Sequence, residues 1–412
     1  MDFEVAIIGA GAAGISAARM LTSLGRKVVV IEASSRVGGR AWTNEIYGLP
    51  LDMGCGWLHS GERNPLVDMA RAEGFDVVEG RTAWQDQWRD LGFTPDDRKA
   101  ALEAWAGMSK QMERDPPASD RASDALDPGG KWNAYCQSLS GYLNGAPLDS
   151  LSVEDFLAYD KAATQSNWRV REGYGTLLVR SMPPVPLYLS CAARKVRQTR
   201  TGVRIETDRG TVDSRAVIVT VSTAVLARAL IEFDAEMDDH LHAAGNLPLG
   251  LADKLFFHLE GNHGLEAETH LLGNPANDKT GSYYIRPLGR PIVEGFFGGP
   301  GAIALEDAGV LEAFAFAIEE LTALLGGKIE KYLKPISSSS WCNVKWIHGS
   351  YSHALPGCAR DRETLAKPVS ERLFFAGEAT SRFDFSTAHG AWESGIRAVQ
   401  EFAACYPKAV AP

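Results

Sequence analysis

The feature that most constrains the fold is a glycine-rich turn near the start of the chain. The apolar run Val5–Ile8 leads directly into residues 9–14, which read Gly-Ala-Gly-Ala-Ala-Gly, and residues 15–24 follow with helical spacing. A second apolar run over residues 27–31 has the composition of a buried strand. A strand, a crossover helix and a second strand in this order predict a βαβ unit, and with it a parallel sheet that carries helices on its faces.

The same turn predicts a dinucleotide site. In a G-x-G-x-x-G turn, the first glycine permits the tight bend, the second lets a pyrophosphate approach the backbone, and the third lets helix and strand pack closely. The helix N-terminus adds a positive dipole end, and an acid at the end of the second strand accepts hydrogen bonds from the ribose. A turn without a ligand is the alternative, which the complete set of strand, helix and acid disfavours. The residues concerned are Gly9, Gly11, Ala13, Gly14 and Glu32.

A second glycine pair follows the acid. Residues 36–40 read Arg-Val-Gly-Gly-Arg, and arginine forks suit a doubly charged pyrophosphate. A nicotinamide-only enzyme has no evident need for this second clamp, whose members are Arg36, Gly39 and Arg40. At these residues the chain resembles the flavin-containing amine oxidase family, within the wider group that has a glycine doublet after the ribose-binding acid. The resemblance covers most of the chain and is weakest in two inserts, residues 81–171 and 236–340. It implies that the dinucleotide is FAD.

Other segments extend the resemblance and imply further FAD contacts. Residues 51–59 resemble the family segment that lies along the isoalloxazine ring. The start of the helix predicted over 389–402 would lie at the flavin pyrimidine edge, where the helix dipole favours the reduced state. The cofactor contacts implied in this way are Gly56, Trp57, Val196 (at the adenine), Trp346, Gly377, Glu378, Thr387 and Ala388.

Lys254 is the residue that the resemblance places beside the reacting atoms. It lies in the run 248–257, a predicted buried or half-buried strand in which a bare ammonium is expensive. In the family, the matching lysine hydrogen-bonds a water beside flavin N5. From the residues alone, a lysine at a strand end that extends its ammonium to solvent is the alternative.

Aromatic residues near the end of the chain point to amine chemistry. Trp341, Trp346 and Tyr351 precede a Pro-Gly turn at 356–357. Their spacing resembles the family region in which a tryptophan backs the flavin and a tyrosine stands perpendicular to it, so Trp341 and Tyr351 join Lys254 as implied catalytic residues. Ring faces steer an amine by cation–π attraction and hold its α-carbon near N5. From spacing alone, ordinary core packing is an equal alternative.

Two departures from mitochondrial monoamine oxidases define the expected subclass. Ser350 stands where those enzymes have a cysteine bonded to the flavin, and because serine cannot form that thioether, we expect non-covalent FAD. Thr387 stands where they have a second cage aromatic. The pattern is closer to polyamine oxidases and histone-demethylase-type amine oxidases. The implied substrate contacts are Tyr351, Thr387 and His59, and for His59 a structural role is an equal alternative.

The order of segments predicts two domains in a chain of 412 residues. Strand-rich segments of the nucleotide-binding type alternate with two inserts, one mostly helical and one mixed. We therefore expect a mixed α/β protein with a Rossmann-like FAD-binding domain of the glycine-doublet type, assembled from three segments, and a substrate-binding domain assembled from two. The predicted FAD-binding domain comprises 1–80, 172–235 and 341–412, and the predicted substrate-binding domain comprises 81–171 and 236–340.

Composition and charge argue against several other classes. Hydrophobic residues make up 45% of the chain and charged residues 23%, as in globular proteins. The net charge of −10 makes nucleic acid and anionic membranes poor partners. No apolar run approaches the ~18 residues of a spanning helix, and no signal peptide is evident. Six scattered cysteines and dispersed histidines form no metal pattern. We expect a cytoplasmic protein without a metal.

The resulting hypothesis is oxidation of a C–N bond. A hydride would pass from the carbon next to nitrogen to flavin N5, and the imine would hydrolyse to a carbonyl compound, with oxygen reoxidising the flavin to give hydrogen peroxide. The rivals are a flavin desaturase or porphyrinogen-type oxidase on the same fold, and a non-catalytic flavin-binding regulatory protein. At this level the amine (primary, secondary or polyamine), the acceptor (oxygen or a protein) and the state (monomer or homodimer) stay open.

Overall fold

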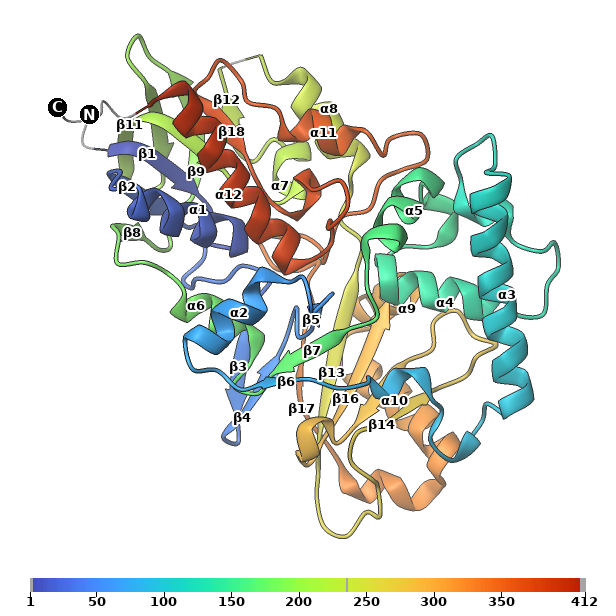
Figure 1. Ribbon diagram of the computed structural model, residues 1–412. Helices are drawn as coiled ribbons and strands as arrows, with labels where there is room; N and C mark the ends of the chain where they lie inside the picture. The colour runs from blue at the N-terminus through green and yellow to red at the C-terminus, as the bar shows by residue number, and fades with distance from the viewer. Residues whose placement is uncertain (1–2, 235, 408–412) are drawn as a thin grey trace.

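The computed structural model describes residues 3–234 and 236–407, and two large sheets organise them (Figure 1). The first sheet has the order β12-β9-β10-β11-β1-β2-β8, with β18 paired to β11. Blue, green and red strands lie together in this sheet, so segments from the start, middle and end of the chain build it. Its strands are β1 (Phe3–Ile8), β2 (Val28–Ile31), β8 (Leu187–Tyr188), β9 (Ala193–Gln198), β10 (Val203–Thr207), β11 (Gly210–Val219), β12 (Glu232–Phe233) and β18 (Leu373–Phe375).

The predicted βαβ unit is present at the centre of this sheet. Strand β1 pairs in parallel with β2 on one side and with β11 on the other, in the registers Val5↔Val28 and Val5↔Ala216. Helix α1 (Ala12–Ser23) crosses between β1 and β2 and packs against α12 (Ala388–Cys405). A Cβ at Gly14 would lie 2.0 Å from the Gly9 carbonyl oxygen, so only glycine lets α1 start this close to the strand.

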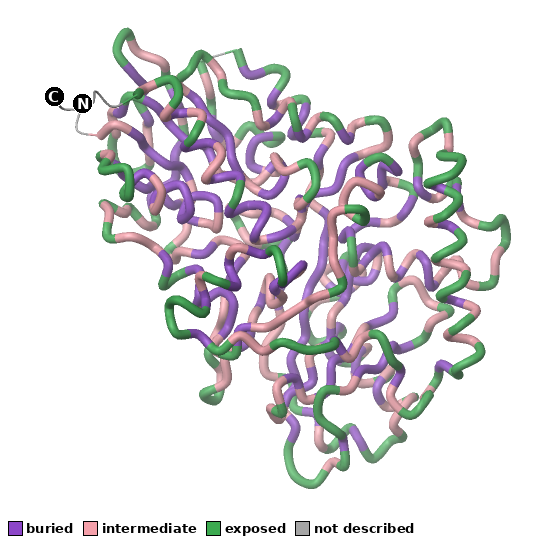
Figure 2. Tube along the Cα trace, viewed as in Figure 1, coloured by how far each residue is buried: buried purple, intermediate pink, exposed green. Residues whose placement is uncertain are grey.

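Buried residues on both faces explain why the first sheet is stable. On the α1–α12 face, a core cluster includes Ile7, Phe374 and Phe402, all fully buried. The opposite face packs against three short helices, α7 (Thr223–Ala227), α8 (Asp238–Asn246) and α11 (Asp361–Ala366). Strands buried on both faces read as continuous apolar runs, which is why the sequence predicts them well. Figure 2 shows the buried residues concentrated along these strands.

The second sheet is antiparallel and lies in the other half of the molecule (Figure 1). Its order is β14-β15-β16-β13-β17. Side chains alternate between its faces: Phe257 packs on Phe314 of the covering helix α10 at 5.1 Å between ring centroids, whereas Lys254 and Phe296 face the opposite way, into a cavity. The elements of this half are β13 (Ala252–Leu259), β14 (Thr269–Leu272), β15 (Ser282–Ile285), β16 (Ile292–Gly298), β17 (Leu333–Ser338), α9 (Pro300–Ala308) and α10 (Val310–Leu325).

The first insert is mostly helical, as predicted, and forms the outer wall beside the second sheet. Residues 115–132 connect two of its helices. Tyr142 of the second helix contacts Phe296 of β16, with 6.0 Å between ring centroids. The helices are α3 (Pro95–Arg114), α4 (Asn133–Asn144) and α5 (Val153–Ala162).

Small elements connect the two halves. Strand β7 lies between β5 and β6, so residues of the first insert pair with residues of the predicted FAD-binding segment. The predicted domain boundaries stay a prediction. Residues 300–325 form two helices and not one, because Gly309 has φ 95° and ends α9 there. The remaining strands and α-helices are β3 (Thr43–Ile46), β4 (Leu49–Asp52), β5 (Leu58–His59), β6 (Val77–Val78), β7 (Asn167–Val170), α2 (Pro65–Ala72) and α6 (Tyr174–Arg180).

Among the described residues, no helix combines the length and the apolar character needed to cross a membrane.

Candidate active site

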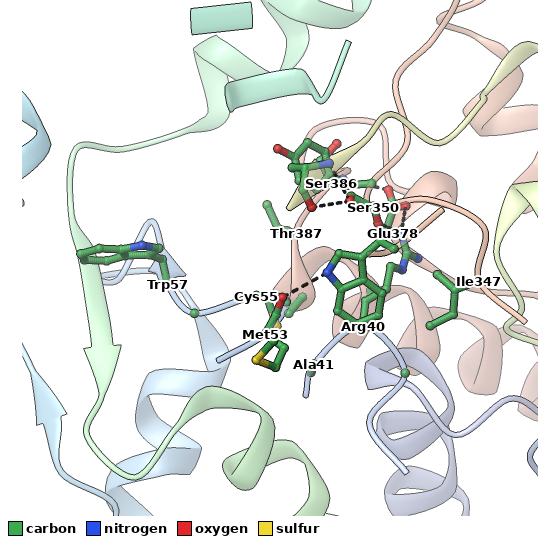
Figure 3. A pocket seen from close by; sticks show the side chains of 18 of the residues that line it. Arg40, Ala41, Met53, Cys55, Trp57, Ile347, Ser350, Glu378, Ser386 and Thr387 are labelled. Carbon is green, nitrogen blue, oxygen red and sulfur yellow. Dashed lines mark hydrogen bonds and ion pairs between the residues drawn. The ribbon is translucent and has the colours of Figure 1, made fainter. Parts of the chain in front are cut away.

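A cavity of about 810 Å³ runs from the glycine turn of the first sheet to the face of the second sheet that carries Lys254. Figure 3 shows part of its wall, with Arg40, Ser350 and Glu378 gathered on one side and Trp57 apart from them on the other. The structure brings most of the sequence-predicted site residues to this cavity. Those that line it are Gly9, Gly11, Ala13, Glu32, Arg36, Gly39, Arg40, Gly56, Trp57, His59, Lys254, Trp341, Trp346, Tyr351, Gly377, Glu378, Thr387 and Ala388.

Glu32 is fixed at one end of the cavity. Its Oε2 accepts a hydrogen bond from the Ala10 amide at 2.7 Å, and its Oε1 accepts from the Ser34 amide and hydroxyl, both at 2.7 Å. A carboxylate has about four acceptor positions, so one remains on Oε2. The acid and the glycine turn therefore form a rigid cradle with capacity for a hydroxyl donor.

Two predicted cofactor contacts do not line the cavity. Gly14 lies behind the turn, where it serves the packing of α1. Val196, expected at the adenine, is 1% exposed in the core, and its carbonyl accepts from the Asp234 amide at 3.2 Å. Ala193, three residues earlier on β9, lines the cavity instead. The structure thus corrects the Val196 assignment: the strand register brings the start of β9 to the cavity.

The two arginines of the second glycine pair differ in how far they are engaged. Arg40 donates to the Ser350 carbonyl at 2.6 Å and pairs with Glu378 at 2.8 Å. Arg36 lies over the ring of Trp42 at 4.8 Å, and burial lowers its pKa although the charge of Glu32 opposes that change. Arg36 is therefore the more available guanidinium for a phosphate, while Arg40 also joins loops from both ends of the chain.

Glu378 lines the cavity, but protein donors occupy its carboxylate. Arg40 and the Ser352 amide bond one oxygen, and the Ser352 hydroxyl and the Ser386 amide bond the other. Burial raises the pKa of Glu378, but the charges of Arg40 and Arg362 outweigh it and hold the pKa below its usual value. A fully occupied carboxylate positions these loops, so the Glu378 side chain has a positioning role, and a cofactor contact by this residue stays a prediction.

Helix α12 begins at the cavity wall. Thr387 caps it by accepting from the Gly390 amide at 3.0 Å, and donates its own proton to the Asp384 carbonyl at 2.7 Å. Because the hydroxyl donates to Asp384 and accepts from Gly390, it has no proton left for a substrate and only one acceptor position. The cap and Ala388 place the positive end of the helix dipole at the cavity.

Lys254 is 5% exposed and held in place by two acceptors. Its Nζ donates to the Asp52 carbonyl at 2.8 Å and pairs with Glu294 Oε1 at 2.9 Å. An ammonium has three donors, and the third has no acceptor among the residues that the structure describes. A Cβ at Gly56 would lie 3.2 Å from this Nζ. The alternative of a lysine reaching solvent is excluded by its burial.

Sequence reasoning missed the groups that surround Lys254. Arg169 of β7 lies 3.9 Å from the Trp57 ring centroid and 4.4 Å from that of Tyr284, and 3.7 Å from Glu294. Burial raises the pKa of Glu294, but Lys254 and Arg169 outweigh it and hold the pKa below its usual value. An acid inside the apolar run of β16 was the signal that could have identified Glu294, because buried charges require partners.

The three aromatic residues predicted near the end of the chain all line the cavity. Trp341 is 3% exposed, donates from its indole to the Met53 carbonyl at 3.1 Å, and meets Trp42 edge-on. Tyr351 lines the cavity and donates from its hydroxyl to the Tyr142 carbonyl at 2.7 Å, which fixes its ring. Trp346 lines the cavity farther along, beside Arg194 at 4.9 Å.

His59 is a neutral group at the cavity wall. Its Nδ1 lies 2.6 Å from the Asn167 amide oxygen, so this nitrogen carries the proton. Burial lowers the pKa of His59 to about 4. The described residues contain no group of acids, histidines and cysteines that could hold a metal ion.

Comparison with known proteins adds the decisive observation. A family model described as flavin containing amine oxidoreductase matches residues 12–402. The chain belongs to this family. Membership confirms the resemblance seen in the sequence. It also implies that the protein uses a flavin cofactor.

Sequence relatives of this amine oxidoreductase include plant proteins. Polyamine oxidase 4 of Oryza sativa subsp. japonica is 27% identical, covering 97% of this chain and 88% of the relative. Polyamine oxidase 2 of Arabidopsis thaliana is 28% identical, covering 97% and 87%. Lysine-specific histone demethylase 1 homolog 1 of Oryza sativa subsp. japonica is 26% identical over 96% of this chain, which spans only 51% of that relative.

A solved structure of putrescine oxidase, wild type with bound putrescine, shares the fold. Its TM-score is 0.78 and its identity 20%, and the match covers 98% of this chain and 99% of the other. The predicted mixed α/β fold with a Rossmann-like cofactor domain is thereby confirmed. At this identity the likeness concerns the fold and leaves the substrate to be argued from the site.

Proposed function

We propose that the protein is an FAD-dependent amine oxidase that acts on CH–NH or CH–NH₂ groups. The observation that carries the proposal is that one cavity joins the Glu32 cradle to Lys254 and Tyr351. The predicted dinucleotide site and the predicted reaction site thus lie in one continuous cavity. A desaturase gives no reason for a buried lysine facing an aromatic wall, so the amine reading is favoured.

The residues present fit FAD. The glycine turn with Glu32 and Ala193 would hold the adenosine, Arg36 and the amides near Gly39 the pyrophosphate, and the α12 N-terminus with Gly56 and Trp341 the ring. Gly11 has room where a Cβ would stand, with nothing within 4 Å of that position, as close approach of a phosphate requires. When bound, FAD supplies the ring that accepts two electrons and a proton equivalent from the carbon next to nitrogen and passes the electrons to oxygen.

The chain's own residues prepare the amine. Aromatic walls keep the cavity largely apolar, which favours the neutral amine whose lone pair stabilises the developing positive charge. The fixed ring of Tyr351 orients the neutral amine by packing against it, and the ring face attracts the positive charge that develops as the hydride leaves. Lys254, held by Asp52 and Glu294, has one proton left with which it would bind a water. A water bound there would hydrolyse the imine product or move a proton.

Non-covalent binding of FAD is part of the proposal. The Ser350 hydroxyl donates to the Ala252 carbonyl and accepts from the Ala252 amide, both at 2.8 Å, so it has a structural role. Cys55 also lines the cavity (Figure 3). Burial, aided by Asp52, raises the pKa of Cys55 to about 12, and a neutral thiol is a poor nucleophile.

Aerobic turnover tests the proposed reaction. The FAD-loaded protein is mixed with a panel of primary amines, secondary amines and polyamines, and hydrogen peroxide and carbonyl product are measured together. We expect equal amounts of both from at least one class. A carbonyl product without peroxide would assign the electrons to a protein acceptor, and neither product from any amine would contradict the proposal.

A further inference from the structure

The substrate half of the cavity is a channel lined along one side by helix α4. Tyr135, Leu139 and Tyr142 line it at intervals of four and three residues, which places them on one face of the helix. Tyr142 is the inner end, because its carbonyl accepts from Tyr351 at 2.7 Å. Seven residues of helix span about 10 Å, so Tyr135 marks a point about that far from the aromatic wall at the reaction site.

A guanidinium without a partner lies at the outer end. Arg98, on the first turns of α3, lines the cavity beside Tyr135, and its charge opposes the rise that burial causes in the pKa of Tyr135. Among residues 3–234 and 236–407, the Arg98 side chain has no hydrogen bond or ion pair. Guanidiniums that form no protein contact inside a cavity are suited to an anionic ligand.

The carboxylates of the cavity are already neutralised. Among the described lining residues the acids are Glu32, Asp86, Glu294 and Glu378. Glu294 is shared by Lys254 and Arg169, and Asp86 is exposed and pairs with Arg81 at 3.1 Å. Glu32 and Glu378 lie at the cofactor end and are bonded by protein donors. No free carboxylate therefore stands in the channel to receive the second ammonium of a diamine or polyamine.

We propose that the substrate is an extended amine that carries a carboxylate about 10 Å from its nitrogen, and that Arg98 binds this carboxylate. This inference rests on the proposed amine oxidation and differs from what the names of the polyamine-oxidase relatives suggest. The second ammonium of a diamine would be repelled by the unpaired guanidinium of Arg98. A carboxylate at the same position would accept charge-assisted, bidentate hydrogen bonds from it. The aliphatic or aromatic body between the two groups would pack on Tyr135, Leu139 and Tyr142.

Binding of octanoate tests the inference without turnover. Calorimetry measures the Kd of octanoate for the FAD-loaded wild type, for Arg98→Gln and for Arg114→Gln, a control on the exposed C-terminal turn of the same helix. We expect Arg98→Gln to weaken binding about tenfold or more, as loss of a hydrogen bond to a charged group does, and Arg114→Gln to leave it unchanged. Equal affinities for wild type and Arg98→Gln, or no binding to the wild type, would overturn the inference.

A matched trio of substrates separates this inference from the amine oxidation itself. The trio is octylamine, ω-aminooctanoate and octane-α,ω-diamine. At the end far from the reacting amine these carry no charge, a negative charge and a positive charge, respectively. We expect the amino acid to have the highest kcat/KM in the wild type and the diamine to have it in Arg98→Glu. If the diamine is preferred by the wild type, the carboxylate assignment fails while amine oxidation stands. If none of the three reduces the flavin but Arg98 still determines octanoate binding, the proposed function fails and the anion site stands.

Discussion

At the scale of single residues, the reaction site depends on how a buried ammonium is stabilised. Lys254 is 5% exposed, and Glu294 supplies the compensating carboxylate at 2.9 Å. Glu294 is in turn stabilised by Arg169, which is held between two aromatic rings. Buried ion pairs stabilise a protein only when their geometry is good. The contacts with Glu294 and with the Asp52 carbonyl therefore fix the position of the Lys254 ammonium.

Replacing Lys254 should slow catalysis without releasing the cofactor. We expect Lys254→Met to retain FAD and to lower kcat about 100-fold, since removal of a positioned acid–base group commonly has an effect of this order. Stopped-flow absorbance would follow the reductive and oxidative half-reactions separately. Lys334→Met is the control, because that lysine lies on the neighbouring strand β17 and is exposed. Unchanged rates of both half-reactions in Lys254→Met would remove its role.

His270 should make stability fall in mild acid. Burial lowers its pKa to about 4 from the usual 6.5. Between these two values the unfolded chain binds more protons than the folded chain, so the free energy of unfolding falls as the pH falls from about 6.5 to about 4. Urea denaturation across this range should show a wild-type slope steeper than that of His270→Gln by up to about 1.4 kcal/mol per pH unit. Parallel slopes would show that His270 titrates normally.

At the scale of elements, sequence patterns predicted the features that depend only on neighbouring residues. The glycine turn, Glu32 and the buried strands follow from spacing and apolar runs, and the structure places them as expected. Val196 was misplaced because the register of β9 depends on its pairing with β10, which no local pattern specifies. Arg98, Arg169 and Glu294 come from three distant segments, so only the assembled fold shows that they share a cavity.

The α12 cap gives a prediction at this scale. Thr387→Ala removes the acceptor of the Gly390 amide and should lower the free energy of unfolding by about 1 kcal/mol. Thr387→Ser keeps the oxygen and should retain most of the stability. Chemical denaturation of the FAD-loaded variants measures both. Equal losses in the two variants would mean that the methyl group, and not the cap, is what stabilises this helix start.

At the scale of the whole molecule, the cofactor site is where segments far apart in the chain meet. Residues of the glycine turn, of β9, of the loop at Trp346 and of α12 all line one cavity. A ligand that contacts all of them stabilises the folded state by mass action, by about 2.7 kcal/mol at 100 times its Kd. Bound FAD should therefore contribute strongly to holding these segments together in the folded protein.

Removal of the cofactor tests both this role and its non-covalent attachment. Acid precipitation should release all of the flavin into the supernatant if the proposed non-covalent attachment holds, since the Ser350 hydroxyl is held by Ala252 and the Cys55 thiol is neutral. The apoprotein should melt at a lower temperature than the holoprotein and recover when FAD is added back. Yellow colour retained in the pellet would contradict non-covalent binding, and an unchanged Tm would contradict the stabilising role.

The most direct measurement is the flavin absorbance of the FAD-loaded protein mixed with amines in the absence of oxygen. We expect that at least one amine bleaches the flavin band, that the rate follows the concentration of neutral amine, and that the colour returns on exposure to air. Intact bound FAD that no primary amine, secondary amine, amino acid or polyamine can bleach would contradict it.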